Sequence, residues 1–219
     1  NNDGYSDVIV GAFLYDGGQT NEGRVYVFRG SMTGISFILS PWTFESNQAD
    51  ANFGFSVASA GDVNGDGFSD IITGGYRFNS AFSNDGVVYV FHSTGSTYPS
   101  SPTSIRTGTE TGEFFGYSVS TAGDVNADGY SDVIVGAPLY GLTDQGKCYA
   151  YLGSSSGIAA THVWSQVGYG QFGISVSTAG DMNADGYADV ILGGNFLDGG
   201  QTDEGEAYIY LGYTGGLEG

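Results

Sequence analysis

The sequence predicts an all-β protein built from about 3.6 repeats of a four-stranded antiparallel sheet. One sequence motif returns at nearly regular intervals along the whole chain. Turn and strand formers dominate the composition, because the 219 residues include 39 Gly, 16 Tyr and 14 Phe. No stretch shows a sustained helical period. Together these features favour short strands joined by glycine-rich turns over a helical or disordered chain.

The repeated motif begins with Phe-Gly-x-Ser-Val, at 53–57, 115–119 and 172–176. Ala-Gly-Asp follows each copy and leads into an aspartate-rich loop, and a shortened copy of this loop begins the chain. Equivalent aspartates, at positions 3, 66, 128 and 185, are separated by 63, 62 and 57 residues. A period of about 61 residues is typical of one β-propeller blade with its loops. The approximate repeats are 1–52 (partial), 53–114, 115–171 and 172–219 (partial).

Four strands are expected within each period. The first carries Phe-Gly-x-Ser-Val, and the second follows the aspartate-rich loop, as at 132–138. A polar loop leads to the third strand, as at 88–91, and a looser fourth strand surrounds Trp42 or Trp164. This scheme gives three first, four second, four third and three fourth strands. The first sheet would lack its innermost strand and the last its outermost, so we expect part of a larger propeller or a subunit of an assembly.

The three complete loops have the pattern D-x-N-x-D-G-x-x-D. In such a loop, side-chain oxygens at positions 1, 3, 5 and 9 and the carbonyl of position 7 converge, and Gly at position 6 permits the turn. Hard oxygen ligands in a flexible loop favour Ca²⁺ over Mg²⁺. An EF-hand is excluded, because position 12 is Thr73, Val135 or Leu192 instead of Glu. The remaining alternative is that these loops are simply turns.

The predicted calcium ligands fall in four loops. They are Asp62, Asn64, Asp66, Phe68 and Asp70; Asp124, Asn126, Asp128, Tyr130 and Asp132; Asp181, Asn183, Asp185, Tyr187 and Asp189; and Asn1, Asp3, Tyr5 and Asp7. The aromatic residue of each set contributes its backbone carbonyl. The shortened loop lacks the aspartate of position 1, so we expect it to bind more weakly or to stay empty.

The charge is one-sided, with 24 acidic and 5 basic residues and a net charge of −19. Nucleic acid and anionic membrane surfaces are poor partners for such a chain, because they require clustered Lys and Arg. The single cysteine, Cys148, excludes an intrachain disulfide. No apolar run is long enough for membrane insertion and no signal peptide is found, so we expect a mature or excised segment.

Phe-Gly at the start of each repeat, with Gly-Ala-Pro at 136–138, resembles the FG-GAP repeat of integrin α-subunits. The chain also resembles bacterial secreted and surface proteins that contain this repeat. The resemblance covers nearly the whole chain, although Gly-Ala-Pro is altered at 11–13, 74–76 and 193–195. It implies a seven-bladed β-propeller at the cell surface or outside the cell, of which this chain is roughly half. It also implies calcium loops on the lower face.

The loops opposite the calcium loops are the candidate ligand surface. Residues 16–23 are nearly repeated at 198–205. This face would carry Gln19, Gln201, Asn47 and Gln48. It can be a surface that binds a protein or glycan ligand, or a set of solvated hairpin tips.

The other chemically distinctive residues do not form a catalytic constellation. His92 and His162 are isolated in the sequence, and Cys148 occupies a position where other repeats have a small hydrophobic residue. Trp42 and Trp164 suit sheet packing, with sugar stacking as the alternative. We therefore expect no enzyme.

Three functions are compatible with these features. The first is a calcium-binding, extracellular interaction or adhesion module. The second is a structural subunit that assembles through its incomplete edge sheets, and the third is a calcium-dependent lectin, by resemblance to fungal propellers of this repeat type.

Overall fold

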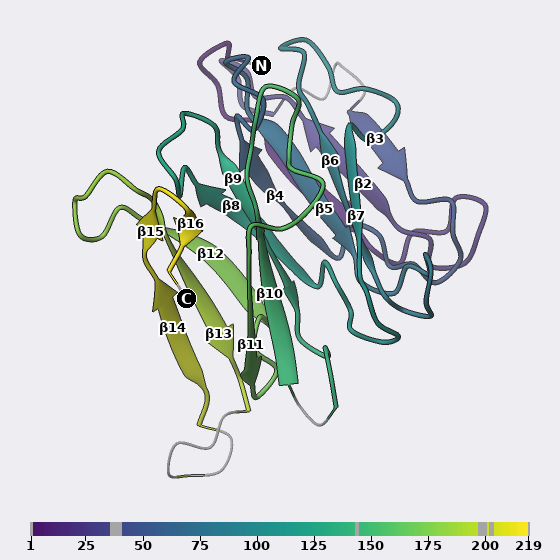
Figure 1. Ribbon diagram of the computed structural model, residues 1–219. Helices are drawn as coiled ribbons and strands as arrows, with labels where there is room; N and C mark the ends of the chain where they lie inside the picture. Colours follow the sequence, from purple (N-terminus) through teal and green to yellow (C-terminus); the bar gives the residue numbers. More distant parts are fainter. Residues whose placement is uncertain (1, 36–40, 143–144, 197–200, 202–203, 219) are drawn as a thin grey trace.

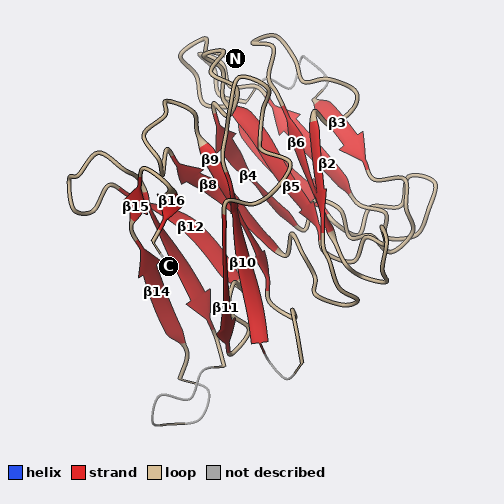
Figure 2. Ribbon diagram, in the orientation of Figure 1, coloured by secondary structure: helices blue, strands red, loops and turns tan. Residues whose placement is uncertain are grey.

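The computed structural model describes residues 2–35, 41–142, 145–196, 201 and 204–218 (Figure 1). These residues form strands and loops only, so they contain no helix that could cross a membrane (Figure 2). The prediction of an all-β fold is confirmed.

Four main antiparallel sheets follow one another along the chain, and each strand pairs with the next one. The first sheet contains β1 (Val8–Ala12), β2 (Arg24–Phe28) and β3 (Trp42–Glu45). The second contains β4 (Ser56–Gly61), β5 (Asp70–Gly75), β6 (Val87–Phe91) and β7 (Ser104–Thr107). The third contains β8 (Ser118–Gly123), β9 (Asp132–Ala137), β10 (Gln145–Tyr151) and β11 (Trp164–Tyr169). The fourth contains β12 (Ser175–Gly180), β13 (Asp189–Gly194) and β14 (Glu206–Tyr210).

This strand order agrees with the expected first, second, third and fourth strands of each repeat. A short hairpin of β15 (Gly212–Tyr213) and β16 (Gly216–Leu217) was not expected. The position of the Phe-Gly pair is a second difference, because β4, β8 and β12 begin at the serine and not at Phe-Gly. The glycines of this pair have φ angles of 80°, 82° and 86°, a left-handed conformation that interrupts a strand.

The Phe-Gly pair of each repeat fits against a second glycine in the preceding sheet. A Cβ atom on Gly136 would lie only 2.0 Å from the carbonyl oxygen of Gly173. The corresponding distances are 1.8 Å at Gly11 and 1.9 Å at Gly74, so a larger residue does not fit. The Ser118 hydroxyl also donates a hydrogen bond to the Gly173 carbonyl at 2.7 Å. The two glycine positions together set the spacing of neighbouring sheets.

The hydrophobic core is divided among the three junctions between neighbouring sheets. Phe53, Phe115 and Phe172 are each almost completely buried in one junction. β5 and β9 are buried along their whole length, whereas β1 and β13 have exposed positions. A sheet enclosed by two neighbours has to be apolar on both faces. The sheets therefore lie side by side as blades of a β-propeller, and the first and last blades each present one open face (Figure 1).

A β-bulge precedes each complete aspartate-rich loop. The register between the first and second strands shifts immediately before the loop, at Gly61, Gly123 and Gly180. These glycines have φ angles of 75°, 81° and 71°. A bulge with glycine in this conformation bends the strand. The bend sends the chain into the loop at the end of each sheet.

Candidate functional site

The first aspartate of each complete loop folds the chain around its own carboxylate. Asp62 Oδ1 accepts hydrogen bonds from the backbone N–H groups of Gly65 at 2.7 Å and Asp66 at 3.0 Å. Asp62 Oδ2 accepts the N–H group of Gly67 at 2.8 Å. In the other two complete loops, the first aspartate also accepts hydrogen bonds from the N–H groups of the residues four and five positions after it. These bonds measure 2.8 to 3.1 Å. The sequence pattern thus produces the same tight turn three times.

The third and fifth positions bond to each other. The Asn64 Nδ2 group donates to Asp66 Oδ2 at 2.9 Å, and Asp66 Oδ1 accepts the N–H group of Phe68 at 3.0 Å. The equivalent amide–carboxylate bonds in the other complete loops measure 2.9 and 2.7 Å. The shortened loop keeps part of this pattern, because Asp3 Oδ1 accepts the N–H group of Tyr5 at 3.0 Å. Asn1 lies outside the described residues.

The ninth position holds a fully buried carboxylate in each complete loop, at Asp70, Asp132 and Asp189. Asp132 Oδ2 accepts the N–H group of Val125, and Oδ1 accepts that of Gly153, both at 2.8 Å. The other two aspartates accept equivalent pairs of bonds at 2.8 to 3.1 Å. One donor always lies within the loop and the other follows the third strand of the same sheet.

Burial raises the pKa of Asp70 and of Asp132 to about 7. The two backbone N–H donors of each carboxylate lower its pKa, and the other two carboxylates of the same loop raise it further. Burial is the largest of these effects. The ionised form of Asp70 or of Asp132 therefore needs a compensating positive charge nearby.

The predicted side-chain ligands of each loop share one turn, but their carboxylates do not converge. Among the described residues, no three carboxylate, imidazole or thiol groups are close enough together to hold a metal ion. The reason is local, because the carboxylates of the first, fifth and ninth positions bond to different backbone N–H groups. At least one oxygen of each of these carboxylates keeps a further lone pair, and every ligand atom is a hard oxygen. This donor set fits Ca²⁺ better than a transition metal.

Sequence reasoning missed the second N–H donor to the buried carboxylate. Ser93, Gly153 and Gly212 supply it in the three complete sites, and Gly30 supplies it to Asp7 Oδ1 at 2.9 Å in the shortened one. The sequence could have predicted these donors, because each one lies two residues after the end of the third strand of its repeat. Glycine is needed at 153 because a Cβ atom there would lie 2.4 Å from the carbonyl oxygen of Ser131.

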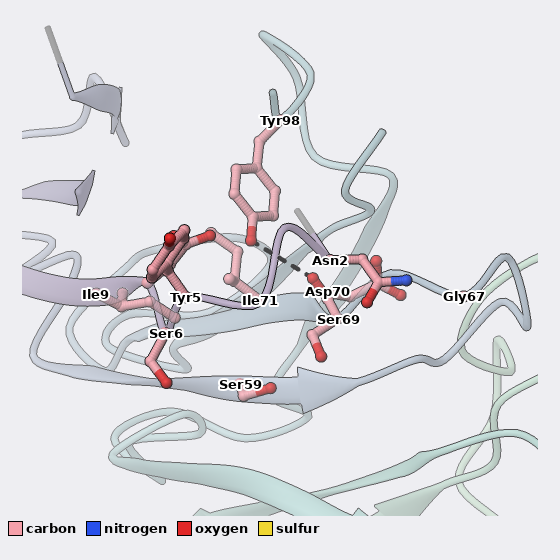
Figure 3. Close-up of a pocket in the computed structure, with 11 residues that line it drawn as sticks. Asn2, Tyr5, Ser6, Ile9, Ser59, Gly67, Ser69, Asp70, Ile71 and Tyr98 are labelled. Carbon is pink, nitrogen blue, oxygen red and sulfur yellow. Dashed lines mark hydrogen bonds between the residues drawn. The ribbon is translucent and has the colours of Figure 1, made fainter. Parts of the chain in front are cut away.

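A cavity of about 320 Å³ lies between the shortened loop and loop 62–70 (Figure 3). Asp7, Ser69, Asp70 and Tyr98 are among its lining residues, and the Tyr98 hydroxyl donates to the Ser69 carbonyl at 3.4 Å. In the next junction the end of β4 occupies the corresponding space, where Gly61 faces Ser131. The cavity therefore lies where the described part of the first sheet has no first strand.

The opposite ends of the sheets carry a row of aromatic side chains, which we call the aromatic surface. It consists of Phe13, Phe55, Tyr76, Phe114 and Tyr117. Neighbouring ring centroids lie 4.7 to 5.3 Å apart. Phe13 is 37% exposed and the others are half-buried. The signal for four of these residues was an aromatic residue after Phe-Gly or in an altered Gly-Ala-Pro segment. Phe114 precedes Phe-Gly and had no such signal.

The polar residues predicted for the opposite face mainly connect its loops. Gln48 Nε2 donates to the Asn79 carbonyl at 3.1 Å, and Gln48 Oε1 accepts the Asn79 N–H group at 2.6 Å. Gln19 Nε2 donates to the carbonyl of Asn47 at 2.8 Å. Gln201 is exposed, but most of its loop lies outside the described residues. Gln19 and Gln48 thus connect neighbouring loops, and ligand binding by this set of residues stays a prediction.

Of the other residues considered, Cys148 is fully buried in the junction of the third and fourth sheets. Neither tryptophan is exposed: Trp164 is 8% exposed and Trp42 is half-buried, and both pack on aromatic rings of the next sheet. Sheet packing is therefore their role. His162 contacts the ring of Tyr149 with centroids 5.3 Å apart.

Comparison with known proteins gives two concordant results. Residues 1–28, 53–91, 115–151 and 172–210 match the FG-GAP repeat. The chain is 32% identical over 184 residues to integrin alpha-5 of Xenopus laevis, a match of 79% of this chain and 16% of that protein. It is 38% identical over 159 residues to integrin alpha-IIb of Mus musculus, covering 67% and 15%. It is 35% identical over 158 residues to integrin alpha-3 of Cricetulus griseus, covering 68% and 15%.

Proposed function

Because the chain belongs to the FG-GAP repeat family, we propose that it is a non-enzymatic interaction module outside the cell or at its surface, stabilised by calcium. The relationship to integrin α-subunits supports the adhesive and extracellular part of this proposal. The chain spans only 15% to 16% of those relatives. We therefore look for a candidate binding face on the surface of this chain itself.

The observation that supports calcium most directly is the threefold recurrence of one loop geometry around a fully buried aspartate. The side chains of positions 1, 3, 5 and 9 and the carbonyl of position 7 would hold the ion. A bound Ca²⁺ would supply the positive charge that Asp70 and Asp132 need in order to stay ionised when buried. The loop of Asp3 and Asp7 would form a weaker fourth site.

Calorimetric titration of the chelated protein tests the calcium proposal. We expect three tight equivalents of Ca²⁺ and weak or no binding of Mg²⁺. Asp128→Ala should remove one of the three, whereas Asp50→Ala, which removes an exposed aspartate outside the loops, should keep all three. Undiminished calcium binding by Asp128→Ala would contradict the assigned ligands.

The aromatic surface is the best candidate for the face that binds a protein partner. Partly exposed aromatic rings provide a large contact area and lose little conformational entropy on binding, and such rings are enriched where proteins bind each other. A random peptide library and a glycan array, screened with and without chelator, test this choice. Peptides that bind the protein but not its Phe13→Ser/Tyr76→Ser variant support a protein partner. Glycan binding that survives in the variant would favour the lectin alternative instead.

A second candidate function, assembly with further repeats, is favoured by the open face of the fourth sheet. A groove there is lined by Ser175, Val176, Ser177, Ile191, Leu192, Gly193 and Ala207. At Gly193 a Cβ atom would meet only Ser175, whereas at Gly136 it would meet the carbonyl of the next Phe-Gly pair. The groove therefore has the shape of an open junction. Sedimentation should show concentration-dependent association that Gly193→Val abolishes; a monomer at all concentrations would contradict self-assembly.

A further inference from the structure

At each junction between neighbouring sheets, one side chain of the fourth strand donates a hydrogen bond to a loop of the next sheet. Trp42 Nε1 donates to the carbonyl of Pro99, and Trp164 Nε1 donates to the carbonyl of Glu218, both at 3.2 Å. The second sheet has no tryptophan in its outer strand. Arg106 of β7 takes this role and reaches into the third sheet.

The acceptors all belong to the segment that follows the third strand of the next sheet. We call these segments, at 92–103, 152–163 and 211–218, the outer loops. The same outer loops supply the N–H group that bonds the buried carboxylate of the metal loop, for example Gly153 to Asp132 at 2.8 Å. Each buried aspartate is thus fixed by an outer loop, and each outer loop is fixed by a side chain of the preceding sheet.

At the middle junction the connection runs from Arg106 through two hydrogen bonds. Arg106 Nε donates to the Ala159 carbonyl at 2.8 Å, and Nη2 donates to the Ile158 carbonyl at 2.5 Å. The Ala159 N–H group in turn donates to the carbonyl of Leu152 at 2.7 Å. Leu152 is the immediate neighbour of Gly153 in the chain. Two hydrogen bonds and one peptide link therefore join the guanidinium group to the donor of Asp132.

Further contacts make outer loop 152–163 a single unit. The Ser154 hydroxyl donates to the Gly157 carbonyl at 2.8 Å, and the Gly157 N–H group donates to the Ser154 carbonyl at 2.7 Å. The Ser154 N–H group donates to the carbonyl of Val63, within the metal loop of the second sheet, at 3.0 Å. These hydrogen bonds connect residues 158–159 to residues 153–154.

We propose that Arg106 is a positioning residue for the calcium site at 124–132, an inference that rests on the calcium binding proposed above. The guanidinium group fixes outer loop 152–163, so the Gly153 N–H group restricts the orientation of the Asp132 carboxylate before the ion arrives. Without Arg106, ordering of this loop has to accompany calcium binding, and its entropic cost lowers the affinity. Arg106 of the second sheet thereby raises the calcium affinity of the metal loop in the third sheet.

The test is a calcium titration followed by NMR, with one reporter for each loop. The N–H groups of Gly67, Gly129 and Gly186 bond to the first aspartate of their respective loops. For Arg106→Gln we expect about tenfold weaker calcium binding at Gly129 and less than about twofold change at Gly186. Gly67 should show an intermediate change, because its metal loop accepts the Ser154 N–H group at Val63. Arg106→Lys keeps a donor and a cation, so it should recover part of the affinity.

Two control variants separate positioning from charge and from global stability. Arg77→Gln removes an exposed positive charge, which should strengthen calcium binding slightly at all sites, opposite in sign to Arg106→Gln. Trp42→Phe removes the donor to Pro99 and keeps an aromatic ring at this position. This variant should weaken the site of Gly67 but not that of Gly129. Equal changes at all three reporters, or none at Gly129 in both Arg106 variants, would overturn the inference. The absence of any calcium-induced shift in the wild type would instead contradict calcium binding itself.

Discussion

At the scale of single residues, a missing Cβ atom decides how closely two sheets approach. Gly136 lies on a strand buried on both faces, and its hydrogen atoms face the carbonyl oxygen of Gly173. Gly193 occupies the same position in the last repeat, where no such carbonyl is present among the described residues. Substitutions at Gly136 and at Gly193 therefore compare the same strand position with and without a neighbouring sheet.

Gly136→Ala should destabilise the protein by about 3 kcal/mol or more, because the added methyl group forces the two sheets apart. Gly193→Ala should cost much less, since its Cβ atom has only the rotatable Ser175 hydroxyl to displace. Urea unfolding of the two variants measures the difference. Equal destabilisation would show that strand propensity, and not the junction, dominates.

The buried Glu113 gives the protein a pH dependence of its own. Burial raises the pKa of this carboxyl group above its usual 4.5, although the Thr109 N–H group and the Tyr149 hydroxyl donate to it. The folded state therefore binds a proton more tightly than the unfolded chain, and stability falls as the pH rises through the raised pKa. Glu113→Gln should remove this loss. Unfolding free energies at pH 4.5 and pH 8 should show that the variant gains stability relative to the wild type at the higher pH.

At the scale of elements, the metal loops are linked from sheet to sheet and are not independent turns. The Ser131 N–H group donates to the Asp62 carbonyl, and the Ala188 N–H group donates to the Asp124 carbonyl, both at 2.9 Å. Each bond joins the eighth residue of one loop to the first residue of the preceding loop. A loop made rigid by calcium thereby restrains its neighbour.

Hydrogen exchange should reveal this link. The amide protons of Ser131 and Ala188 should exchange slowly with calcium and markedly faster with a chelator, because their acceptors lie in the metal loops. Amides in β5 and β9, which are buried along their whole length, serve as the internal reference. Unchanged protection of Ser131 after chelation would mean that the loops keep their order without metal.

At the scale of the whole molecule, the net charge of −19 opposes folding through repulsion among acidic loops. Binding of a ligand only to the folded state contributes about 2.7 kcal/mol per site at a hundredfold excess over Kd. Three sites would together contribute on the order of 8 kcal/mol, comparable with the stability of a whole domain. Calcium would therefore decide whether the folded chain is stable or marginal.

Chelation should accordingly lower the melting temperature by many degrees, and Mg²⁺ should restore little of the loss. Differential scanning fluorimetry with EGTA, followed by addition of each ion, measures this directly. Asp128→Ala should reproduce part of the decrease. A melting curve that does not respond to chelator would mean that the aspartate-rich loops are turns without a structural metal.

The sequence by itself determined the all-β class, the order of strands in each sheet and the position of the turns at 62–70, 124–132 and 181–189. These features depend on local patterns, namely the alternation of residues along strands and the Asx and glycine chemistry of turns. Only the tertiary structure decided which glycines face each other and which outer loop donates to each buried aspartate. It also decided that Arg106, two residues after the position aligned with the tryptophans, bonds to the next sheet. Those contacts join residues about 20 to 60 positions apart, so they depend on how successive sheets pack and not on any local pattern.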